Sequence, residues 1–231
     1  MDKFKKDAAI AALSLVQDGM TIGLGTGSTA AHFVKALGHR GLKDIKGVPT
    51  SVATRDLAQD VGIKIIEPDE TTKIDLAVDG TDEVDGSLNL IKGGGGALLR
   101  EKIVAHAARR FIVIADGTKK VSQLGKFKLP LEIETALFGL TINGVRDVIS
   151  SLGYQDVQIE LRPGERGPFI TDGGGYILDC ALERITDAHA LNDAFRSLPG
   201  VVETGLFIGL ADGVILCGED GLETMGTVGL D

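Results

Sequence analysis

Residues 74–103 limit the possible folds of this chain most strongly. The segment IDLAVDGTDEVDGSLNLIKGGGGALLREKI begins with an apolar stretch, Ile74–Val78, that predicts a buried strand. Two aspartates, a lysine and four consecutive glycines, Gly93–Gly96, then lead into a predicted helix. Glycine loses more backbone entropy on folding than any other residue, so a folded chain seldom contains such a run without a use. The segment therefore predicts a small polar centre beside a glycine loop.

The glycine loop and the helix predicted over residues 97–110 together indicate acid–base chemistry. Without Cβ atoms, the N–H groups of Gly93–Gly96 can converge on an anion or a developing oxyanion, and Lys92 adds a positive charge at the entrance. Glu101 has only apolar residues one helical turn away on either side, so it lacks a salt-bridge partner at helical spacing. Desolvation raises the pKa of a carboxyl group, which suits a general base. We interpret Glu101 as that base in preference to a surface glutamate.

Two aspartates follow the predicted strand at Ile74–Val78. One aspartate in Asp79-Gly-Thr-Asp82 would be interpreted as an ordinary turn former. Ligands of open α/β sheets bind at the carboxyl ends of the strands, and two carboxylates there can accept hydrogen bonds from sugar hydroxyls. We therefore favour a role for both Asp79 and Asp82 in ligand binding.

A second glycine-rich turn, Gly25-Thr-Gly-Ser-Thr29, lies between a strand predicted over 20–24 and a helix predicted over 30–37. Backbone N–H groups and two hydroxyls at a helix N-terminus are typical of a phosphate site, although a simple Ser/Thr cap would explain one of these residues. The spacing Gly25-x-Gly27-x-x-Ala30 also fits a loose dinucleotide fingerprint. That alternative is weak, because the next strand ends in Pro-Thr-Ser and not in an acidic residue.

Alternating strands and helices predict a parallel sheet covered on both faces. Further strands are predicted over 48–51, 63–66 and 111–115, with helices over 4–16 and 55–61. From Leu129 onward the pattern changes to strands over 157–161 and 176–180 and helices over 142–152 and 187–197, while 206–210 and 214–217 are expected to return to the first sheet. We predict an α/β fold with a Rossmann-like domain over 1–128 and 205–231, and a smaller α+β domain over 129–204 inserted before the C-terminal strands.

The charge and the cysteine and histidine content of the chain limit the kinds of molecule that it is expected to bind. A net charge of −9 argues against nucleic-acid binding, so a small molecule is the expected ligand. Two cysteines are too few for a disulfide framework, and four scattered histidines lack metal-ligand spacing. No apolar run approaches the roughly 20 residues that span a bilayer. We expect a cytoplasmic protein that binds no membrane and needs neither metal nor cofactor. Lys5 and Lys6, in the charged N-terminal helix, are either solvated or reach a bound phosphate.

Five motifs give the chain a resemblance to the A-type ribose-5-phosphate isomerase family. They are GLGTGSTA (Gly23–Ala30), VDGTDEVDG (Val78–Gly86), IKGGGGALLREKI (Ile91–Ile103), IADGTKK (Ile114–Lys120) and GVVETGLF (Gly200–Phe207). The resemblance implies interconversion of ribose 5-phosphate and ribulose 5-phosphate in the pentose phosphate pathway, without a metal, by a homodimer or homotetramer.

The resemblance also implies roles for individual residues. Glu101 matches the catalytic base that moves a proton between C2 and C1, and Lys92 with the amides of the glycine loop matches the groups that stabilise the enediolate. Asp79 and Asp82 match carboxylates that hold the opened sugar. The remaining substrate-binding positions are Thr26, Gly27, Ser28, Thr29, Gly80, Thr81, Gly93, Gly94, Gly95 and Lys119. From position alone, Lys119 is either a phosphate contact or a solvated loop charge.

The chain departs from the family pattern at Gly96 and Leu99, where the family often has Ala and Thr, and by lacking a proline within residues 132–138. None of these positions has a proposed chemical role. Three other classes remain as alternatives: a sugar-phosphate sensor, which would need a DNA-binding module; an amino-sugar phosphate isomerase or deaminase, which would favour a histidine in the motif cluster; and a nicotinamide enzyme.

Overall fold

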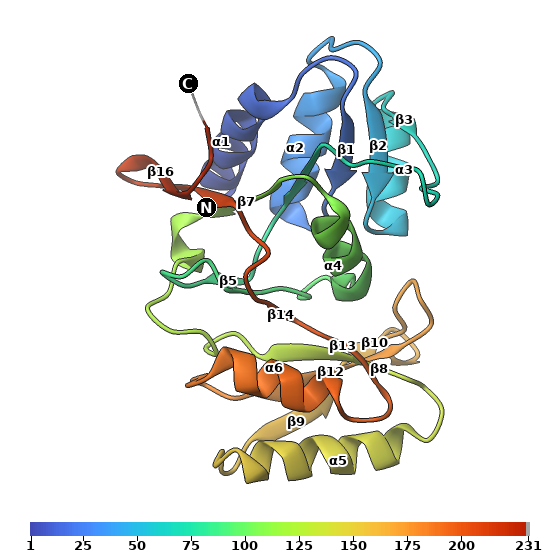
Figure 1. Ribbon diagram of the computed structural model, residues 1–231, viewed down its shortest axis with the longest axis vertical. Helices are drawn as coiled ribbons and strands as arrows, with labels where there is room; N and C mark the ends of the chain where they lie inside the picture. The colour runs from blue at the N-terminus through green and yellow to red at the C-terminus, as the bar shows by residue number, and fades with distance from the viewer. Residues whose placement is uncertain (230–231) are drawn as a thin grey trace. The chain divides into compact units, whose positions relative to one another are not determined.

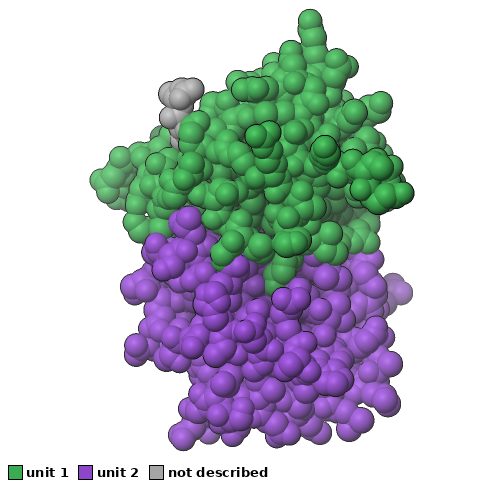
Figure 2. All heavy atoms as spheres, viewed as in Figure 1, with its two compact units in different colours: residues 1–81, 100–120, 209–231 green, residues 82–99, 121–208 purple. Residues whose placement is uncertain are grey.

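A computed structural model describes residues 1–229, which form two compact units (Figure 2). The first unit comprises Met1–Thr81, Arg100–Lys120 and the chain from Gly209 onward, and the second comprises Asp82–Leu99 and Val121–Ile208. Each unit has its own hydrophobic core.

The first unit contains a seven-stranded sheet in the order β16-β15-β7-β4-β1-β2-β3 (Figure 1). Its strands are β1 (Thr21–Leu24), β2 (Lys46–Pro49), β3 (Lys64–Ile65), β4 (Leu76–Asp79), β7 (Phe111–Asp116), β15 (Gly213–Gly218) and β16 (Gly221–Gly226). All neighbouring strands are parallel except β15 and β16. The sheet thereby brings the carboxyl ends of β1, β4 and β7 to one edge.

Helices cover both faces of this sheet, as its uniformly buried central strands require. The helical elements of the unit are α1 (Asp2–Ala12), η1 (Leu13–Leu15), α2 (Ser28–Gly38), α3 (Val52–Asp60), most of α4 (Leu98–Ala107) and η2 (Gly117–Lys119). Ile22 and Leu24 join the core beneath α1 and α2. Gly23 points to the opposite face, where a Cβ atom would come within 2.5 Å of Val104 on α4. A glycine in β1 therefore allows α4 to pack directly on the sheet.

The second unit is built on an antiparallel sheet in the order β13-β8-β12-β9. Its strands are β8 (Leu129–Ile133), β9 (Gln158–Leu161), β12 (Tyr176–Ala181) and β13 (Val201–Thr204), and its helices are α5 (Phe138–Ser151) and α6 (Ala188–Arg196). A three-stranded sheet of β5 (Glu83–Val84), β6 (Leu90–Ile91) and β14 (Leu206–Phe207), and a hairpin of β10 (Pro163–Gly164) and β11 (Gly167–Pro168), complete the unit. Leu191 and Phe195 of α6, with Val145 and Ile149 of α5, form its core with the sheet.

The predicted α/β class with a mainly parallel sheet is confirmed. One strand prediction was wrong: residues 206–210 do not return to the first sheet, because Leu206 and Phe207 pair with Ile91 and Leu90 in the second unit. Strand β16 was not predicted, since its residues are largely exposed and lack apolar alternation. The compact units also differ from the predicted domain boundaries. Residues 82–99, 121–128 and 205–208 belong to the second unit, and pairing of β5 and β6 with β14 accounts for the first and last of these segments.

Within residues 1–229, every helix is too short or too polar to span a bilayer.

Candidate active site

The predicted site residues fall into two groups, one in each unit. In the first unit, the turn after β1 is held by the carboxylate of Asp79, which ends β4. Oδ1 of Asp79 accepts hydrogen bonds from the backbone N–H groups of Thr26 at 3.1 Å and Gly80 at 2.7 Å. A Cβ atom on Gly25 would lie 2.2 Å from the same oxygen. The structure thus brings the glycine turn and the Asp79 segment together, a contact that the sequence did not reveal.

A cluster of hydroxyl groups fixes the side chain of Thr26. Its Oγ1 lies 2.7 Å from Oγ1 of Thr50, 2.8 Å from Oγ of Ser51 and 3.2 Å from Oγ1 of Thr54. Thr54 in turn donates to the carbonyl of Gly25 at 2.9 Å. Sequence reasoning assigned no role to the last three residues, although the Pro-Thr-Ser end of β2 had already distinguished the site from a dinucleotide fold. Their hydroxyl groups give the turn a second set of supports.

The helix that follows the turn begins at Ser28, and Gly27 precedes it with φ of 107°, a value that favours glycine. Nζ of Lys5 donates to Oγ of Ser28 at 3.0 Å. The ammonium group of Lys5 therefore lies at the turn. The Thr29 side chain is buried beside Gly80, whose Cβ position lies 3.8 Å from Cβ of Thr29. Backbone amides, hydroxyls and one ammonium group therefore gather at a positive helix end.

Glu101 and Lys119 belong to two other helical elements of the first unit, α4 and η2. Glu101 lies in the first turn of α4 and is only 4% exposed, so its predicted desolvation is confirmed. Lys119 is half-buried in η2, which follows β7, the parallel neighbour of β4. Asp116 caps η2 by accepting the N–H of Thr118 at 3.1 Å. Lys119 consequently shares the sheet edge with Asp79.

The second unit contains Asp82, Lys92 and the glycine loop. Asp82 donates its N–H to the carbonyl of Ile91 at 2.9 Å, and its Oδ2 accepts the N–H of Gly94 at 2.8 Å. The N–H of Gly96 donates to the carbonyl of Gly93 at 3.0 Å, which closes the loop into a turn. Gly93 and Gly96 have φ of 108° and 76°, a backbone conformation that favours glycine.

Two of the N–H groups in this loop donate to protein acceptors, and two donate to none of the described residues. Those of Gly94 and Gly96 are used by the protein itself. Among residues 1–229, those of Gly93 and Gly95 have no protein acceptor. Two of the four amides therefore remain available to a ligand.

Lys92 is held by β14. Its N–H donates to the carbonyl of Gly205 at 2.9 Å, and its Nζ lies 5.4 Å from the centroid of the Phe207 ring. A Cβ atom on Gly205 would come within 2.4 Å of the carbonyl oxygen of Lys92. The side chain of Lys92 is 2% exposed, so its charge is removed from bulk water. Gly205 and Phe207 belong to the motif GVVETGLF, to which sequence reasoning gave no chemical role.

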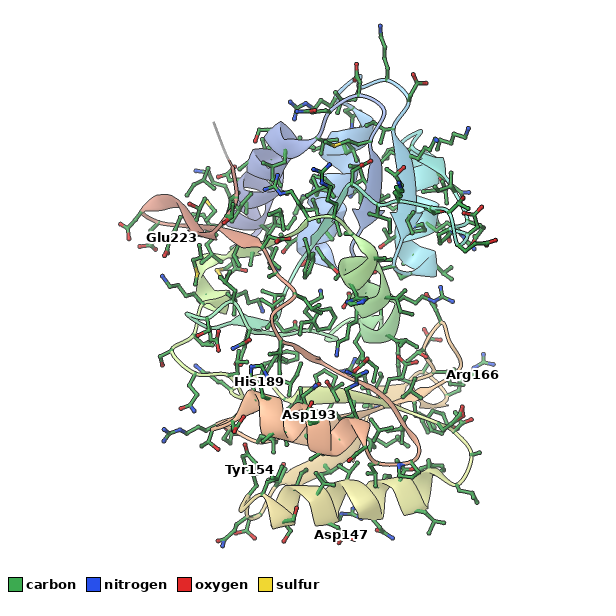
Figure 3. The ribbon with its side chains drawn as sticks, viewed as in Figure 1. Asp147, Tyr154, Arg166, His189, Asp193 and Glu223 are labelled. Carbon is green, nitrogen blue, oxygen red and sulfur yellow. The ribbon has the colours of Figure 1, made fainter. Side chains whose placement is uncertain are left out.

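The histidines lie outside these segments. His32 pairs with Asp2 at 3.0 Å, His39 follows α2, His106 is in the last turn of α4, and His189 lies on α6 (Figure 3). Among the described residues, no group of three or more His, Cys, Asp or Glu side chains could hold a metal ion. The positions of the histidines give no support to a histidine-assisted ring opening.

The first unit is an open α/β sheet whose glycine turn, Asp79 and Lys119 lie at the carboxyl ends of its parallel strands, the edge at which ligands of this class of fold bind. A family model described as ribose 5-phosphate isomerase A (phosphoriboisomerase A) matches residues 46–221. Ribose-5-phosphate isomerase A of Rhodopseudomonas palustris (strain BisB18) is 50% identical over 96% of this chain and 96% of its own length. That of Bradyrhizobium diazoefficiens is 50% identical over 97% of this chain and 96% of its own length.

Solved structures agree with these relatives. Ribose 5-phosphate isomerase from Plasmodium falciparum aligns with a TM-score of 0.91 and 35% identity, covering 98% of this chain and 99% of that one. A D-ribose-5-phosphate isomerase in complex with phospho-erythronic acid aligns with a TM-score of 0.88 and 40% identity, covering 97% and 98%. The chain belongs to the ribose-5-phosphate isomerase A family, whose members are isomerases of sugar phosphate metabolism.

Proposed function

We propose that this chain interconverts D-ribose 5-phosphate and D-ribulose 5-phosphate through an enediolate, with Glu101 as the general base, in the non-oxidative branch of the pentose phosphate pathway. The carboxylate of Glu101 takes the proton from C2 of the open-chain aldose. The C–H electron pair forms the C1–C2 double bond, and the negative charge moves to O1. Glu101 then returns the proton to C1 while O1 gains a proton and O2 loses one, which gives the ketose.

The position of Glu101 is the single observation that carries this proposal. It is a carboxylate exposed to only 4%, in the first turn of the helix that directly follows the glycine loop. The positive end of a helix favours the ionised carboxylate, while exclusion of water makes that carboxylate a stronger base. These two effects suit a group that must be ionised before the reaction and must accept a proton from carbon during it.

Stabilisation of the enediolate is assigned to Lys92 and to the amides of Gly93 and Gly95. A buried ammonium group and preorganised N–H donors interact most strongly with the charge that develops on O1 and O2 in the transition state. Asp79, Asp82, Gly80 and Thr81 are assigned to the hydroxyl groups of the opened sugar. The carboxylates that would accept these hydroxyls also hold the two glycine turns, at 3.1 Å to the N–H of Thr26 and 2.8 Å to that of Gly94.

The phosphate group is assigned to Thr26, Gly27, Ser28 and Thr29 at the N-terminus of α2, with Lys119 and Lys5 as cations. The contact between Lys5 and Ser28 supports this assignment. Phospho-erythronic acid, which the related isomerase binds, carries a phosphate and a carboxylate on one short chain. A ligand with those two groups requires one anion site for the phosphate and a second set of donors for the carboxylate. The turn at Gly25–Thr29, with Lys5 beside Ser28, supplies donors of the first kind.

We further propose a homodimer or homotetramer in the cytoplasm. Leu137 and Leu140 are 77% and 68% exposed on the second unit, and Ile170 is 61% exposed. Phe138 beside them packs edge-on against Tyr176, whose backbone forms a bridge with Ile170. Exposed apolar side chains in one region support burial against another copy. Free, buried Cys180 and Cys217 agree with a reducing compartment.

The test compares Glu101→Gln with a matched substitution, Glu83→Gln. Glu83 is an equally buried carboxylate, but it accepts the N–H groups of Gly125 at 2.7 Å and Phe127 at 2.6 Å and has no proposed part in the reaction. We expect Glu101→Gln to lower kcat for ribulose 5-phosphate formation by about 10²–10⁴-fold while leaving the melting temperature nearly unchanged. Glu83→Gln should lower stability and keep kcat within a few-fold.

The reaction run in D₂O provides the second measurement. Wild-type protein should introduce deuterium at C1 of the product, because a carboxyl group that has taken the C2 proton exchanges it with solvent. A Glu101→Gln variant with kcat within about tenfold of wild type would remove Glu101 from the role of base.

A further inference from the structure

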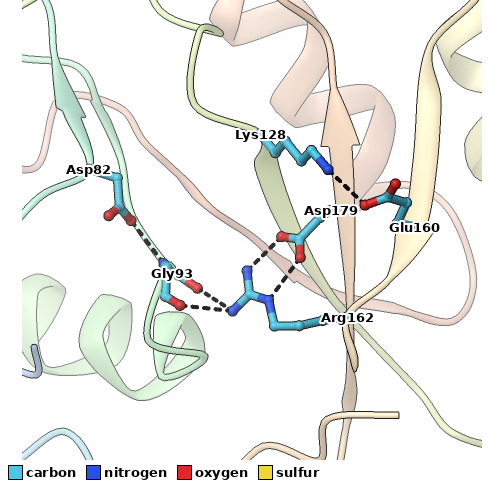
Figure 4. A network of polar contacts seen from close by, with 7 residues as sticks. Asp82, Gly93, Lys128, Glu160, Arg162 and Asp179 are labelled. Atoms are coloured by element: carbon cyan, nitrogen blue, oxygen red, sulfur yellow. Dashed lines mark hydrogen bonds and ion pairs between the residues drawn. The ribbon is translucent and has the colours of Figure 1, made fainter. Parts of the chain in front are cut away.

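The glycine loop of the second unit is clamped from outside by Arg162, the residue that follows β9. Nη1 of Arg162 donates to the carbonyl oxygens of Gly93 at 2.8 Å and Gly94 at 3.1 Å (Figure 4). On its other side, Nε and Nη2 donate to the two carboxylate oxygens of Asp179 at 2.8 and 2.5 Å. We propose that Arg162 is a positioning residue for the isomerisation, which fixes the loop so that the open amide of Gly95 faces the enediolate. This inference rests on the proposed function.

The geometry of the peptide unit explains how a bond to a carbonyl controls an amide. The C=O and N–H groups of a trans peptide lie in one plane and point in opposite directions. A bond to the carbonyl of Gly93 therefore directs the N–H of Gly94 away from Arg162, and that N–H is found on Asp82 at 2.8 Å. By the same relation, the bond to the carbonyl of Gly94 fixes the direction of the N–H of Gly95. Arg162 thus orients one of the two amides that have no protein acceptor among residues 1–229.

The loop needs such a clamp because of its composition. Four glycines have wide conformational freedom, and the turn is closed internally by one hydrogen bond from Gly96 to Gly93. Oxyanion stabilisation depends on donors that are already in place, since reorganising them during the reaction reduces the benefit. A guanidinium group bonded to two successive carbonyls removes much of that freedom.

The surroundings of Arg162 hold the guanidinium itself in one place. Its side chain and that of Asp179 are 14% and 15% exposed, and the pair is bidentate, an arrangement that is strong and directional. The ring of Phe169 lies 6.0 Å from Cζ of Arg162 and also borders Gly96, where a Cβ atom would meet the ring at 2.4 Å. Asp179 lies in β12, in the middle of the antiparallel sheet. Arg162 thereby links the glycine loop to a strand in the interior of the sheet.

A neighbouring ion pair supplies the matched control. Lys128 donates to Glu160 at 2.7 Å, and Glu160 lies directly opposite Asp179 in the register of β9 and β12 (Figure 4). These side chains are 45% and 55% exposed, and neither contacts the glycine loop in Figure 4. Lys128→Met removes this ion pair and keeps every hydrogen bond of Arg162; it also removes the charge interaction of Lys128 with Asp179, so it controls for a change of charge beside the clamp.

The experiment measures kcat and KM for ribose 5-phosphate in Arg162→Lys, Arg162→Ala, Asp179→Asn and Lys128→Met. Lysine keeps the charge but lacks the planar fork, so it cannot bind Asp179 and both carbonyls together. We expect Arg162→Lys to lower kcat about tenfold or more and to change KM less than about threefold, since the loop acts mainly on the transition state. Lys128→Met should leave both constants within about twofold of wild type.

Chemical rescue separates positioning from a purely structural role. Added guanidinium ion should restore part of the kcat of Arg162→Ala and leave Arg162→Lys and Lys128→Met unchanged. If Arg162→Ala does not fold, the kinetic constants of Asp179→Asn test the role of Arg162 instead. This variant keeps the guanidinium group and weakens only the ion pair that holds it. We expect Asp179→Asn to lower kcat and to leave KM nearly unchanged. That result would support the positioning role of Arg162.

The inference is overturned if Arg162→Lys and Asp179→Asn both fold and keep kcat within about twofold of wild type. Glu101→Gln, measured in the same series, separates this outcome from failure of the proposed function. If Glu101→Gln loses turnover and Arg162→Lys does not, only the role of Arg162 is rejected. If Glu101→Gln retains turnover, the proposed base is rejected, whatever Arg162 does.

Discussion

The two glycine turns of this isomerase are held in different ways. The turn at Gly25–Thr29 is fixed by strand ends that adjoin it in the parallel sheet: Asp79 at the end of β4, and Thr50, Ser51 and Thr54 after β2. The loop at Gly93–Gly96 is fixed on one side by Asp82 and on the other by Arg162, which lies 68 or 69 residues away along the chain. Both turns have an aspartate that accepts a backbone N–H. They differ in what completes the support.

This difference shows that two similar glycine turns can respond differently to substitution of their glycines. In the first turn, Gly25 packs directly against Asp79, including the backbone of that residue, so a Cβ atom there has no room. The second depends on one long side chain and on the apolar neighbours of its glycines. We therefore expect substitutions in the first turn to act mainly through steric overlap with backbone, and those in the second to be relieved in part by movement of side chains.

Gly25→Ala tests the first turn and should have the largest effect. Its Cβ atom would lie 2.2 Å from Cγ and Oδ1 of Asp79 and 2.6 Å from Cα of Asp79, so the backbone of β4 or β1 must move. We expect a loss of about 3 kcal/mol in the free energy of unfolding, together with most of the activity. Urea unfolding and kcat/KM measure the two losses.

Gly27→Ala is the control for that change. Gly27 has φ of 107° but nothing within 4 Å of its Cβ position, so its substitution adds conformational strain without overlap. A cost of about 1 kcal/mol is expected. Equal losses of stability in the two variants would show that overlap with Asp79 is not what limits the first turn.

Gly93→Ala tests the second loop and should have an intermediate effect. Gly93 has φ of 108°, and its Cβ atom would meet Cδ2 of Leu98 at 2.8 Å and Cγ of Pro130 at 3.2 Å. We expect a loss of about 2 kcal/mol, divided between strain and overlap. In a double-mutant cycle, Leu98→Ala removes the nearest contact, that with Cδ2, and leaves the contact with Cβ of Leu98 at 3.0 Å, so the two changes should show a favourable coupling of about 1 kcal/mol. A coupling of zero would mean that strain alone limits this loop, and the contrast between the turns would then disappear.

Much of the fold could be predicted because its signals are local. Apolar runs such as Phe111–Ala115 are fully buried strands, and the turn between β1 and α2 is a strand–glycine–helix unit visible within ten residues. Strand β14 is different. Leu206 and Phe207 are apolar like any strand of the first sheet, but their partner is β6, and sequence pattern does not specify which strand a short apolar segment will pair with.

The residues of the candidate site likewise fall into those with a local sequence signal and those without one. Asp79, Asp82, Lys92 and Glu101 lie within one segment of the chain, so their spacing alone identifies them as candidates. Arg162 was not found, because a single arginine after an exposed strand carries no signal by itself and its partners, Gly93 and Asp179, are distant in sequence. Phe207 was missed for a similar reason. A motif from the family resemblance included it, but only the contact with Lys92 shows what it supports.

The smallest expected effect concerns the strand that supports the second loop. Cys180 lies next to Asp179 in β12, and burial, with the nearby charge of Asp179, raises the pKa of its thiol from 9.0 to about 12. The native protein therefore keeps this proton between about pH 9 and 12, whereas the unfolded chain loses it, so the native state binds more protons over that range. Stability must then fall as pH rises, by about 1 kcal/mol between pH 9 and 10.

Urea unfolding of wild type and Cys180→Ala at pH 8, 9 and 10 measures this contribution. Other groups that titrate in this range are common to both proteins, so the difference between the two pH profiles isolates Cys180. We expect the loss of stability with rising pH to be smaller in the variant. Identical profiles would mean that water reaches the thiol in native β12, and a strand open to water would be a poor anchor for Asp179. The second loop would then be supported less rigidly than its hydrogen bonds suggest. The difference in rigidity between this loop and the first turn would be larger.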